Sequence, residues 1–407
     1  MTVNDLKAAF PNTKIPDFDD YFSGIMERRL AIYSGKPPWL AAKRSGLHTR
    51  GERRLSQLCA AKSICEEFAA MTFAEQFILE TETSEHKDYL ERIFERTRFM
   101  PRAKKFLADA YALGGGAVKV YVKDSEPCIE FISADKIYPA AFCDGKFTEV
   151  IFRSASLEGG KFLTRLERYK ENETENLIFE SDSRHTLGKL IYNSGVISNP
   201  AAGIFSVFTP AISNNFDVDS PMGISIFDNC VDVLRAIDIA FDSLVREFIL
   251  GKKRIIVPAA SIQTVIDPET GNLTRYFDAD DEAFVALKTE DAEALKITDN
   301  TVELRIEEHT AAINALFNLL CFSVGVSAGT FALNNSLQYY TKTATEVISQ
   351  NSKSARTIRT HQNAFGETIA DICRGLVKTG IWLGEIGGDE GKIAIKWKDN
   401  IITNDSE

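Results

Sequence analysis

Apolar residues recur at helical spacing in the last part of the chain. Two interleaved series of residues, each with a spacing of seven, run through residues 344–379 and include Phe365 and Ile369. This spacing places one mostly apolar stripe along a single long helix. The polar residues Asn351 and Gln362 also fall in the stripe. We therefore expect a long, half-buried helix rather than a tight hydrophobic coiled coil.

Two more helices are predicted upstream, over residues 221–250 and 306–324. For the first of them, Ser220 suits the N-cap and Pro221 suits the first helical position. Charged residues of this helix fall within about 40° of one line at a helical rotation of about 100° per residue. This polar stripe consists of Asp228, Asp232, Arg235, Asp242 and Arg246. It is either a solvated outer face of the helix or the wall of a water-filled channel.

The N-terminal part of the sequence predicts an arm followed by two helices. Residues 1–50 mix prolines with aromatic residues, which indicates an irregular arm with short helices. Residues 52–80 and 84–113 have the apolar periodicity of two amphipathic helices, and Pro101 must restart the second of them. Gly114 to Gly116 end the second helix, and a strand pattern follows. A phosphate-binding loop would need a helix after the glycines, so we expect a helix C-cap and a tight turn.

Strand patterns dominate the next part of the chain. Apolar and polar residues alternate over residues 117–208, and glycine-containing turn signals separate the runs. Residues 251–305 predict a small α/β insert between two helices, and residues 380–407 predict a short tail with one strand. The predicted fold class is therefore α+β.

A long uncharged stretch lies between His309 and Lys342. Within it, residues 310–333 are long enough to cross a bilayer as a helix. Two asparagines one turn apart, glycines near its end and the lack of basic flanks argue against a span. We therefore favour a buried helix that ends in a polar loop over residues 330–343, and we keep the membrane span as an alternative.

Composition narrows the possible functions. With 407 residues, the chain is long enough for two or three domains. Its net charge of −11 argues against a protein that grips nucleic acid through a broad basic face. Its seven cysteines form no C-x-x-C pair, which favours a reduced, intracellular setting. The N-terminus has no apolar h-region, so we expect no signal peptide.

No arrangement of residues in the sequence points to catalysis. The motifs of phosphate-binding loops, serine hydrolases and zinc proteases are missing, and the five histidines fall in separate elements. We therefore expect no enzymatic activity, no metal site and no cofactor. The basic run Lys252, Lys253 and Arg254 is a candidate contact site. Its cations either complement the dipole of the preceding helix or bind a partner.

Several short motifs are informative because of their order. They occupy residues 251–254, 325–331 and 343–347, and they read GKKR, GVSAGTF and TATEV. With these motifs at this spacing, residues 217–379 resemble the portal proteins of tailed bacteriophages, in the long-tailed type of Gram-positive phages and prophages. The order of a helical lobe, a β-rich lobe, a helix, an insert, a helix, a loop and a long helix is similar to that of the family.

The resemblance implies a ring of twelve subunits at one capsid vertex, through which DNA is pumped in and later leaves. It also implies a part for each segment of the subunit. These parts are a wing (residues 1–222, with helices over 52–113 and strands over 117–208), a stem (221–250 and 306–324), a clip (251–305), a tunnel loop (330–343), a long helix (344–379) and a reduced crown (380–407).

The resemblance also implies two groups of contact residues. Lys252, Lys253 and Arg254 would lie at the start of the clip. The tunnel loop would face DNA with Asn334, Asn335, Gln338, Tyr339, Tyr340 and Lys342. A ring of acidic chains would repel the phosphates of a duplex, so that DNA could slide through without being held.

The implied partners are further copies of the chain, the terminase large subunit, the head–tail adaptor, the major capsid and scaffold proteins, and double-stranded DNA bound without sequence specificity. The implied location is the virion, after assembly in the cytoplasm of the bacterial host. Two alternatives stay open. One is another head-assembly protein, such as a minor capsid or adaptor protein, and the other is a membrane protein that spans the bilayer with residues 310–333.

Overall fold

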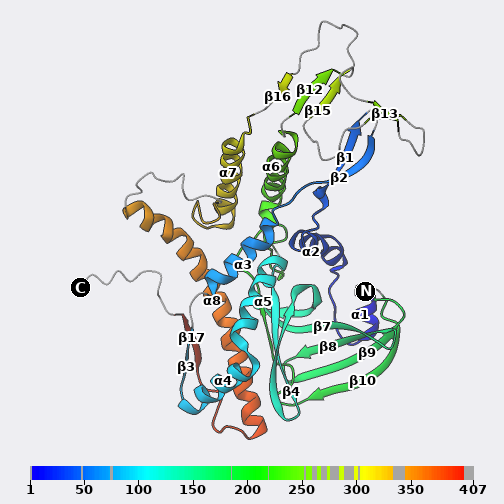
Figure 1. Cartoon of the computed structure of the whole chain (residues 1–407). Coiled ribbons are helices and arrows are strands. Elements are labelled where there is room, and N and C mark those ends of the chain that lie inside the picture. The colour runs from blue at the N-terminus through cyan, green and yellow to red at the C-terminus, as the bar shows by residue number, and fades with distance from the viewer. Residues whose placement is uncertain are drawn as a thin grey trace.

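The computed structural model is an α+β protein in which a helix pair and an insert rise from a larger base (Figure 1). It describes residues 2–46, 49–73, 77–184, 186–218, 220–251, 254–258, 264–266, 273–275, 284–287, 298–300, 303–332 and 344–397. The predicted fold class is confirmed, because helical and β-rich parts are segregated along the chain.

The first residues form the predicted irregular arm with short helices. Its elements are α1 (Val3–Ala9), the π-helix η1 (Tyr21–Met26), α2 (Glu27–Tyr33), the 3₁₀ helix η2 (Pro38–Leu40), and the antiparallel hairpin of β1 (Ala41–Gly46) and β2 (Thr49–Arg54). A capping box starts α1, because the Thr2 side chain accepts from the Asp5 amide and the Asp5 carboxylate accepts from the Thr2 amide.

Four helices build the core of the base. They are α3 (Ala60–Thr72), α4 (Ser84–Thr97), α5 (Phe99–Leu113) and α8 (Ala344–Leu383). The helix predicted over residues 52–80 is wrong at both ends, where strands β2 and β3 (Phe77–Thr81) flank a shorter α3. The helix predicted over residues 84–113 is broken at Arg98, which has the left-handed φ of 50°.

The break follows from the sequence around Pro101. Proline lacks an amide hydrogen and is tolerated only in the first turn of a helix, so a new helix starts just before it. Gly114 ends α5 with a φ of 85°, which confirms the predicted glycine C-cap, and strand β4 follows directly.

Residues 116–208 form two antiparallel sheets, which confirms the predicted β-rich part. The strands are β4 (Gly116–Lys123), β5 (Glu126–Ser133), β6 (Ile137–Cys143), β7 (Lys146–Glu158), β8 (Lys161–Lys170), β9 (Glu173–Ser181), β10 (Lys189–Ser198) and β11 (Phe205–Phe208), with the 3₁₀ helix η3 (Ala134–Lys136). The sheet orders are β11-β4-β5 and β10-β9-β8-β7-β6.

The five-stranded sheet is covered on both faces. Leu6 and Phe10 of the arm pack on one face against Leu166 and Leu177. On the other face, side chains of the three-stranded sheet pack against a set of apolar residues. This set consists of Ile137, Val150, Phe152 and Tyr169.

The helix pair consists of α6 (Val231–Leu250) and α7 (Ile306–Val324), which lie side by side in Figure 1. The prediction of a helix over residues 306–324 is confirmed. The helix predicted to start at Pro221 begins only at Val231, after the 3₁₀ helix η4 (Asp228–Cys230), so the Ser220 N-cap and Pro221 first position are wrong.

Tertiary contacts explain the late start of α6. The segment before it passes so close to α5 that a Cβ on Gly223 would lie 2.2 Å from the Gly114 carbonyl oxygen. The Ile226 amide and the Ser225 hydroxyl both donate to the Tyr111 carbonyl oxygen. These hydrogen bonds replace the first helical turn that the Ser-Pro signal favours.

The insert between α6 and α7 contains only strands in its described residues. They are β12 (Arg254–Pro258), β13 (Thr264–Ile266), β14 (Leu273–Arg275), β15 (Phe284–Leu287) and β16 (Thr298–Asn300). Strand β12 pairs in parallel with β15 and antiparallel with β16. The helical component that we predicted for this insert is not found among those residues.

The last elements return to the base. Helix α8 extends four residues beyond the predicted range of 344–379, to Leu383. The predicted tail strand is β17 (Ile393–Trp397), and it pairs antiparallel with β3. In the part of the chain that the structure describes, no helix is long and apolar enough to cross a membrane.

Candidate functional site on the helix pair α6 and α7

The polar stripe predicted for α6 is divided by the fold into buried and exposed residues. Asp228 and Asp242 are buried, whereas Asp232, Arg235 and Arg246 are exposed. The interpretation as a fully solvated face is therefore wrong for two of the five residues. Asp228 and Asp242 are buried because the N-terminal arm covers this side of η4 and α6.

Asp228 and Arg29 form a buried ion pair at the base of the helix pair. The Arg29 Nη2 atom lies 2.6 Å from the Asp228 Oδ2 atom, and both side chains are at most 2% exposed. Arg29 also donates to the Tyr21 hydroxyl and to the Leu113 carbonyl oxygen. The Ser225 amide donates to the same Asp228 oxygen. One guanidinium thus joins the arm, α5 and the start of η4.

Two further aspartates of α6 bind the arm. The Trp39 indole Nε1 donates to Asp238 Oδ2 at 2.9 Å, and the Leu58 amide donates to the other oxygen. Arg53 donates twice to Asp242, at 2.8 and 2.5 Å, and this pair holds the pKa of the Asp242 carboxyl below its usual range. Asp238, Trp39 and Arg53 are not among the site residues predicted from the sequence.

A second clamp closes the far end of the helix pair. The Arg305 Nε and Nη2 atoms each donate to the Glu247 carboxylate at 3.0 Å, and His309 Nε2 lies 3.7 Å from it. These hydrogen bonds lower the pKa of Glu247 to about 2. A Cβ on Gly251 would lie 2.3 Å from Leu304 Cδ2, so the chain leaves and returns at neighbouring points.

The chain after α7 is fixed against α8. Gly325 ends α7 with a φ of 81°, and its carbonyl oxygen accepts from the Thr357 hydroxyl at 2.6 Å. The Ser327 amide donates to the Ser354 hydroxyl. The Gly329 amide donates to the Asn318 side chain on α7. The loop predicted over residues 330–343 therefore starts from an anchored point.

The predicted loop residues Asn334, Asn335, Gln338, Tyr339, Tyr340 and Lys342 lie outside the described residues, as do Lys252 and Lys253. Arg254 is the first residue of β12, and its side chain also lies outside the description.

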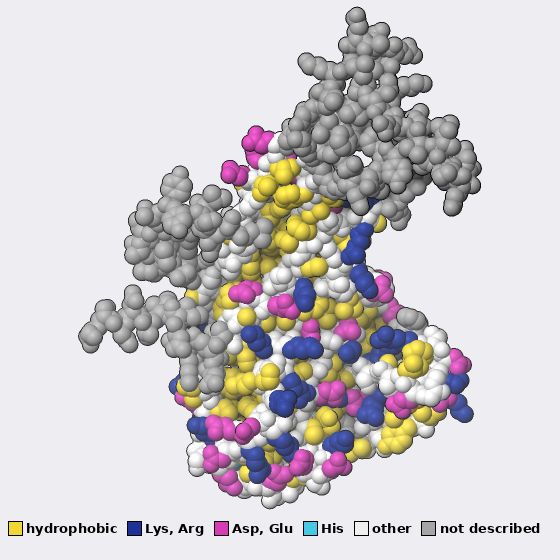
Figure 2. Space-filling view, viewed as in Figure 1, with side chains coloured by type: hydrophobic (Ala, Val, Ile, Leu, Met, Phe, Trp, Pro, Cys, Tyr) yellow, Lys and Arg dark blue, Asp and Glu magenta, His cyan; other side chains and the backbone are white. Residues whose placement is uncertain are grey.

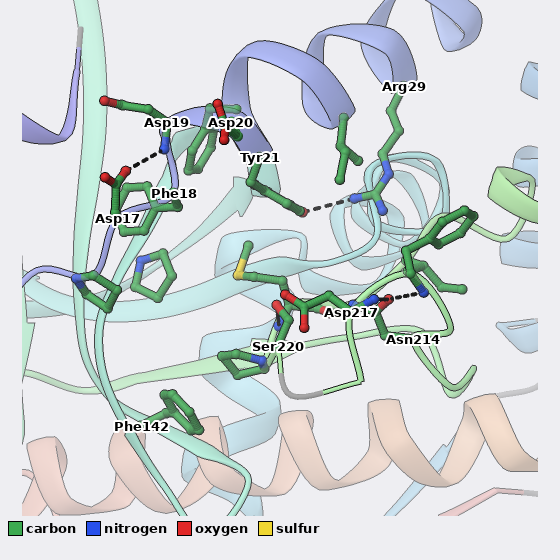
Figure 3. A pocket seen from close by; sticks show the side chains of 18 of the residues that line it. Asp17, Phe18, Asp19, Asp20, Tyr21, Arg29, Phe142, Asn214, Asp217 and Ser220 are labelled. Carbon is green, nitrogen blue, oxygen red and sulfur yellow. Dashed lines mark hydrogen bonds between the residues drawn. The ribbon is translucent and has the colours of Figure 1, made fainter.

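The arm also borders a cleft of about 980 Å³, which faces the segment before α6 (Figure 3). Figure 3 shows aromatic side chains and carboxylates around it, and Tyr21 reaching from the cleft to Arg29. Its labelled carboxylates are those of Asp17, Asp19, Asp20 and Asp217. Among the described residues, no group of three or more metal-ligating side chains has the geometry of a metal site. The cleft is lined by aromatic and acidic side chains of the arm and of the segment before α6.

The comparison with protein families decides the identity. A family model described as "Phage portal protein, SPP1 Gp6-like" matches residues 48–407. The chain belongs to this family of phage portal proteins. The match covers all the motifs on which the resemblance rests, and the prediction of a phage portal protein is confirmed. The assignment to the long-tailed, Gram-positive type stays a prediction.

One similar chain comes from the structure entitled "Virion of native gene transfer agent (GTA) particle". The two share 13% sequence identity at a TM-score of 0.44, and the match covers 84% of the portal protein and 79% of that chain. No curated protein sequence matches the portal protein.

Proposed function

We propose that this portal protein assembles into a closed ring of twelve subunits, which forms the DNA channel at one capsid vertex. The observation that carries the proposal is the helix pair α6–α7, which projects from the base. Its lower end is joined to the arm through Asp228 and Arg29, and its far end is closed by the Glu247–Arg305 pair. In the ring, this pair would be the stem, the insert would be the clip and the remainder of residues 1–222 would be the wing.

The channel would act on DNA by repulsion and weak contacts. Each subunit has a net charge of −11, so a ring carries on the order of a hundred surplus negative charges. A wall of this sign repels phosphates and leaves a duplex free to move. The exposed residues of the stripe, Asp232, Arg235 and Arg246, would line the stem. The loop residues from Asn334 to Lys342 would form the constriction around DNA.

The clip would meet the terminase large subunit during packaging and the head–tail adaptor later, and the wing would meet the major capsid and scaffold proteins. Lys252, Lys253 and Arg254 would supply cations at the start of the clip. We propose a structural role without enzymatic activity, in the virion, after assembly in the host cytoplasm. Replacing the three cations by alanine should preserve the ring and impair packaging or tail joining, and full genomes at normal particle yield would contradict it.

The purified protein tests the proposed ring directly. Negative-stain imaging and mass photometry should show closed rings with an axial hole, without added nucleotide, metal or cofactor. A monodisperse monomer at micromolar concentration, over a range of salt concentrations, would overturn the proposal. Rings of another subunit number would correct the copy number and leave the channel function in place.

A further inference from the structure

Helix α6 is enclosed on two opposite sides within its own subunit. Glu247 binds the start of α7, and Asp242 binds the arm through Arg53. These two residues are about 140° apart around the helix axis. Helix α6 therefore has α7 on one flank, and it has the arm with its β1–β2 hairpin on the other flank.

The outward face of α7 is apolar and exposed. Residues on its inner face, such as Ile313 and Leu320, are fully buried. On the opposite face, Leu319 is 55% exposed and Phe322 is 75% exposed. Small side chains fill the rest of this face, at Ala311, Ala312 and Ala315, and all three are exposed. Such a surface lets a second element approach closely, and exposed apolar patches of this kind mark interaction sites.

The outward face of α7 begins with acidic residues. Glu303, Glu307 and Glu308 are exposed, and the nearby cation Arg305 is engaged by Glu247. Figure 2 shows acidic side chains at the free end of the helix pair, with apolar side chains below them. The flank thus combines a negative end with an apolar stripe.

The opposite flank has the opposite charge. The β1–β2 hairpin contains five cationic residues and one acidic residue, Glu52. The cations are Lys43, Arg44, Arg50, Arg53 and Arg54. Arg53 is held by Asp242, whereas Arg54 is exposed at the base of the hairpin. The hairpin therefore has a net positive charge, whereas the whole chain has a net charge of −11.

We infer that the outward face of α7 packs against the arm-and-hairpin flank of a second copy of this chain. The acidic start of α7 then lies beside the basic base of the neighbour's hairpin, and Leu319 and Phe322 are covered. The two surfaces differ, so the contact is head-to-tail, and a rotation that closes produces a ring. The inference rests on the proposed ring and specifies which faces form it.

Engineered cysteines test the contact. A chain that carries both Glu308→Cys and Arg54→Cys should form disulfides between neighbours under mild oxidation. Denaturing gels should then show a ladder of covalent oligomers that extends to the full ring. Each single variant should give no ladder, because one engineered thiol per chain cannot link more than two copies. A chain with Glu308→Cys and Glu91→Cys is the matched control, since Glu91 is exposed on α4 in the base and lies on neither flank of the helix pair.

The outcomes separate the two proposals. If the untreated protein forms no ring, the proposed function is wrong. If it forms rings and the double-cysteine chain gives no ladder, the ring stands and this contact is wrong. The exposed native thiols of Cys59 and Cys143 are replaced by serine in every variant, so that they contribute no cross-links.

Charge reversal provides a second test that needs no cross-link. Glu307→Lys with Glu308→Lys should raise the concentration for half-assembly roughly tenfold, and Arg54→Glu should do the same. A chain that carries all three substitutions should regain assembly, because the two surfaces then have opposite charges again. The effect of either change should shrink in high salt. If both variants fold natively by circular dichroism and assemble at the same half-assembly concentration as the parent, the proposed contact is wrong.

Discussion

Arg29 is a single residue on which three parts of the subunit depend. Its guanidinium donates to Asp228, Tyr21 and the Leu113 carbonyl oxygen in a site that is almost completely buried. Burying two charges costs solvation, and the Asp228 Oδ2 atom offsets part of this cost by accepting from Arg29 and from the Ser225 amide. Removing one partner therefore costs more than the pair itself contributes.

Arg29→Met should lower the free energy of unfolding by about 3–5 kcal/mol, because the Asp228 carboxylate stays buried without its counterion. Urea denaturation at pH 7 measures the change. The neighbouring residue Arg28 is exposed, so Arg28→Met should change the stability by about 0.5 kcal/mol or less. A loss below about 1 kcal/mol for Arg29→Met would show that water or a rearranged side chain compensates the charge.

His361 is a second residue whose environment has a measurable consequence. It is buried on α8, its Nδ1 accepts from the Ala211 amide, and its ring meets Phe68 and Tyr111 edge-on. Burial lowers the pKa of His361 from 6.5 to about 4. The unfolded chain therefore binds this proton more tightly than the folded chain does.

The stability of the portal protein should consequently fall as the pH decreases from 6.5 to about 4, in part through His361. His361→Asn keeps an acceptor for the amide and removes the titration. Its stability should be lower than that of the parent at pH 7, and the difference should narrow towards pH 4. Denaturation midpoints at a series of pH values measure this, and a constant difference would contradict the assignment.

At the scale of the elements, periodicity predicted the helices whose faces meet a continuous core. The bounds of α7 were predicted correctly, and α8 differs by four residues at its end. The start of α6 was wrong because hydrogen bonds to Tyr111 override the local Ser-Pro signal. Such bonds join residues that are distant in sequence, so no local pattern announces them.

The polar positions in α8 have a similar explanation. We expected Gln362 to interrupt an otherwise apolar stripe, and its side chain is 6% exposed. Its amide donates to the Thr72 carbonyl oxygen at the end of α3. The partner is 290 residues away in sequence, as the arm partners of Asp238 and Asp242 are also remote. A sequence shows that such a residue is polar, and the fold decides what it binds.

Glu247→Gln should loosen the far end of the helix pair. The low pKa of Glu247 means that its ion pair stabilises the fold fully above about pH 4.5, and that this contribution is lost as the pH falls towards about 2. The variant should be less stable than the parent at pH 7, with a difference that disappears on acidification. Amide exchange should also be faster at the end of α6 and the start of α7.

The matched control for this prediction is Glu303→Gln, which changes an exposed carboxylate near the same end of the helix pair. It should leave both the acid profile and the exchange rates unchanged. If both variants changed the acid profile and the exchange rates equally, the loss of one negative charge, and not the loss of the Glu247–Arg305 pair, would explain the effect.

At the scale of the whole molecule, the N-terminal arm contacts the five-stranded sheet, the base and the helix pair. Leu6 and Phe10 pack on the five-stranded sheet, Arg29 reaches α5, and Trp39 binds α6. The family model begins at residue 48, after most of this arm. Most of the arm therefore lies outside the matched region, and its contacts join the base and the helix pair.

Deleting residues 335–339 should leave the ring intact and reduce DNA packaging or retention. These residues carry no charge and are too polar to form a core, and loops of this size in compact proteins usually have a function. Ring formation by imaging and DNA content of the particles measure the two effects. The same deletion with a five-residue Gly-Ser replacement separates loop length from loop chemistry. Failure of the shortened chain to assemble would make the loop a subunit contact.

The neighbouring positions of Gly251 and Leu304 have an evolutionary consequence. A segment that leaves and rejoins a scaffold at one place can be replaced by any other segment whose ends are equally close. Recombination between viral genomes could therefore exchange residues 252–303 as a cassette, provided that the Glu247–Arg305 pair is kept. A virus that acquires a different motor or tail could then adapt this one segment while the helix pair keeps its sequence.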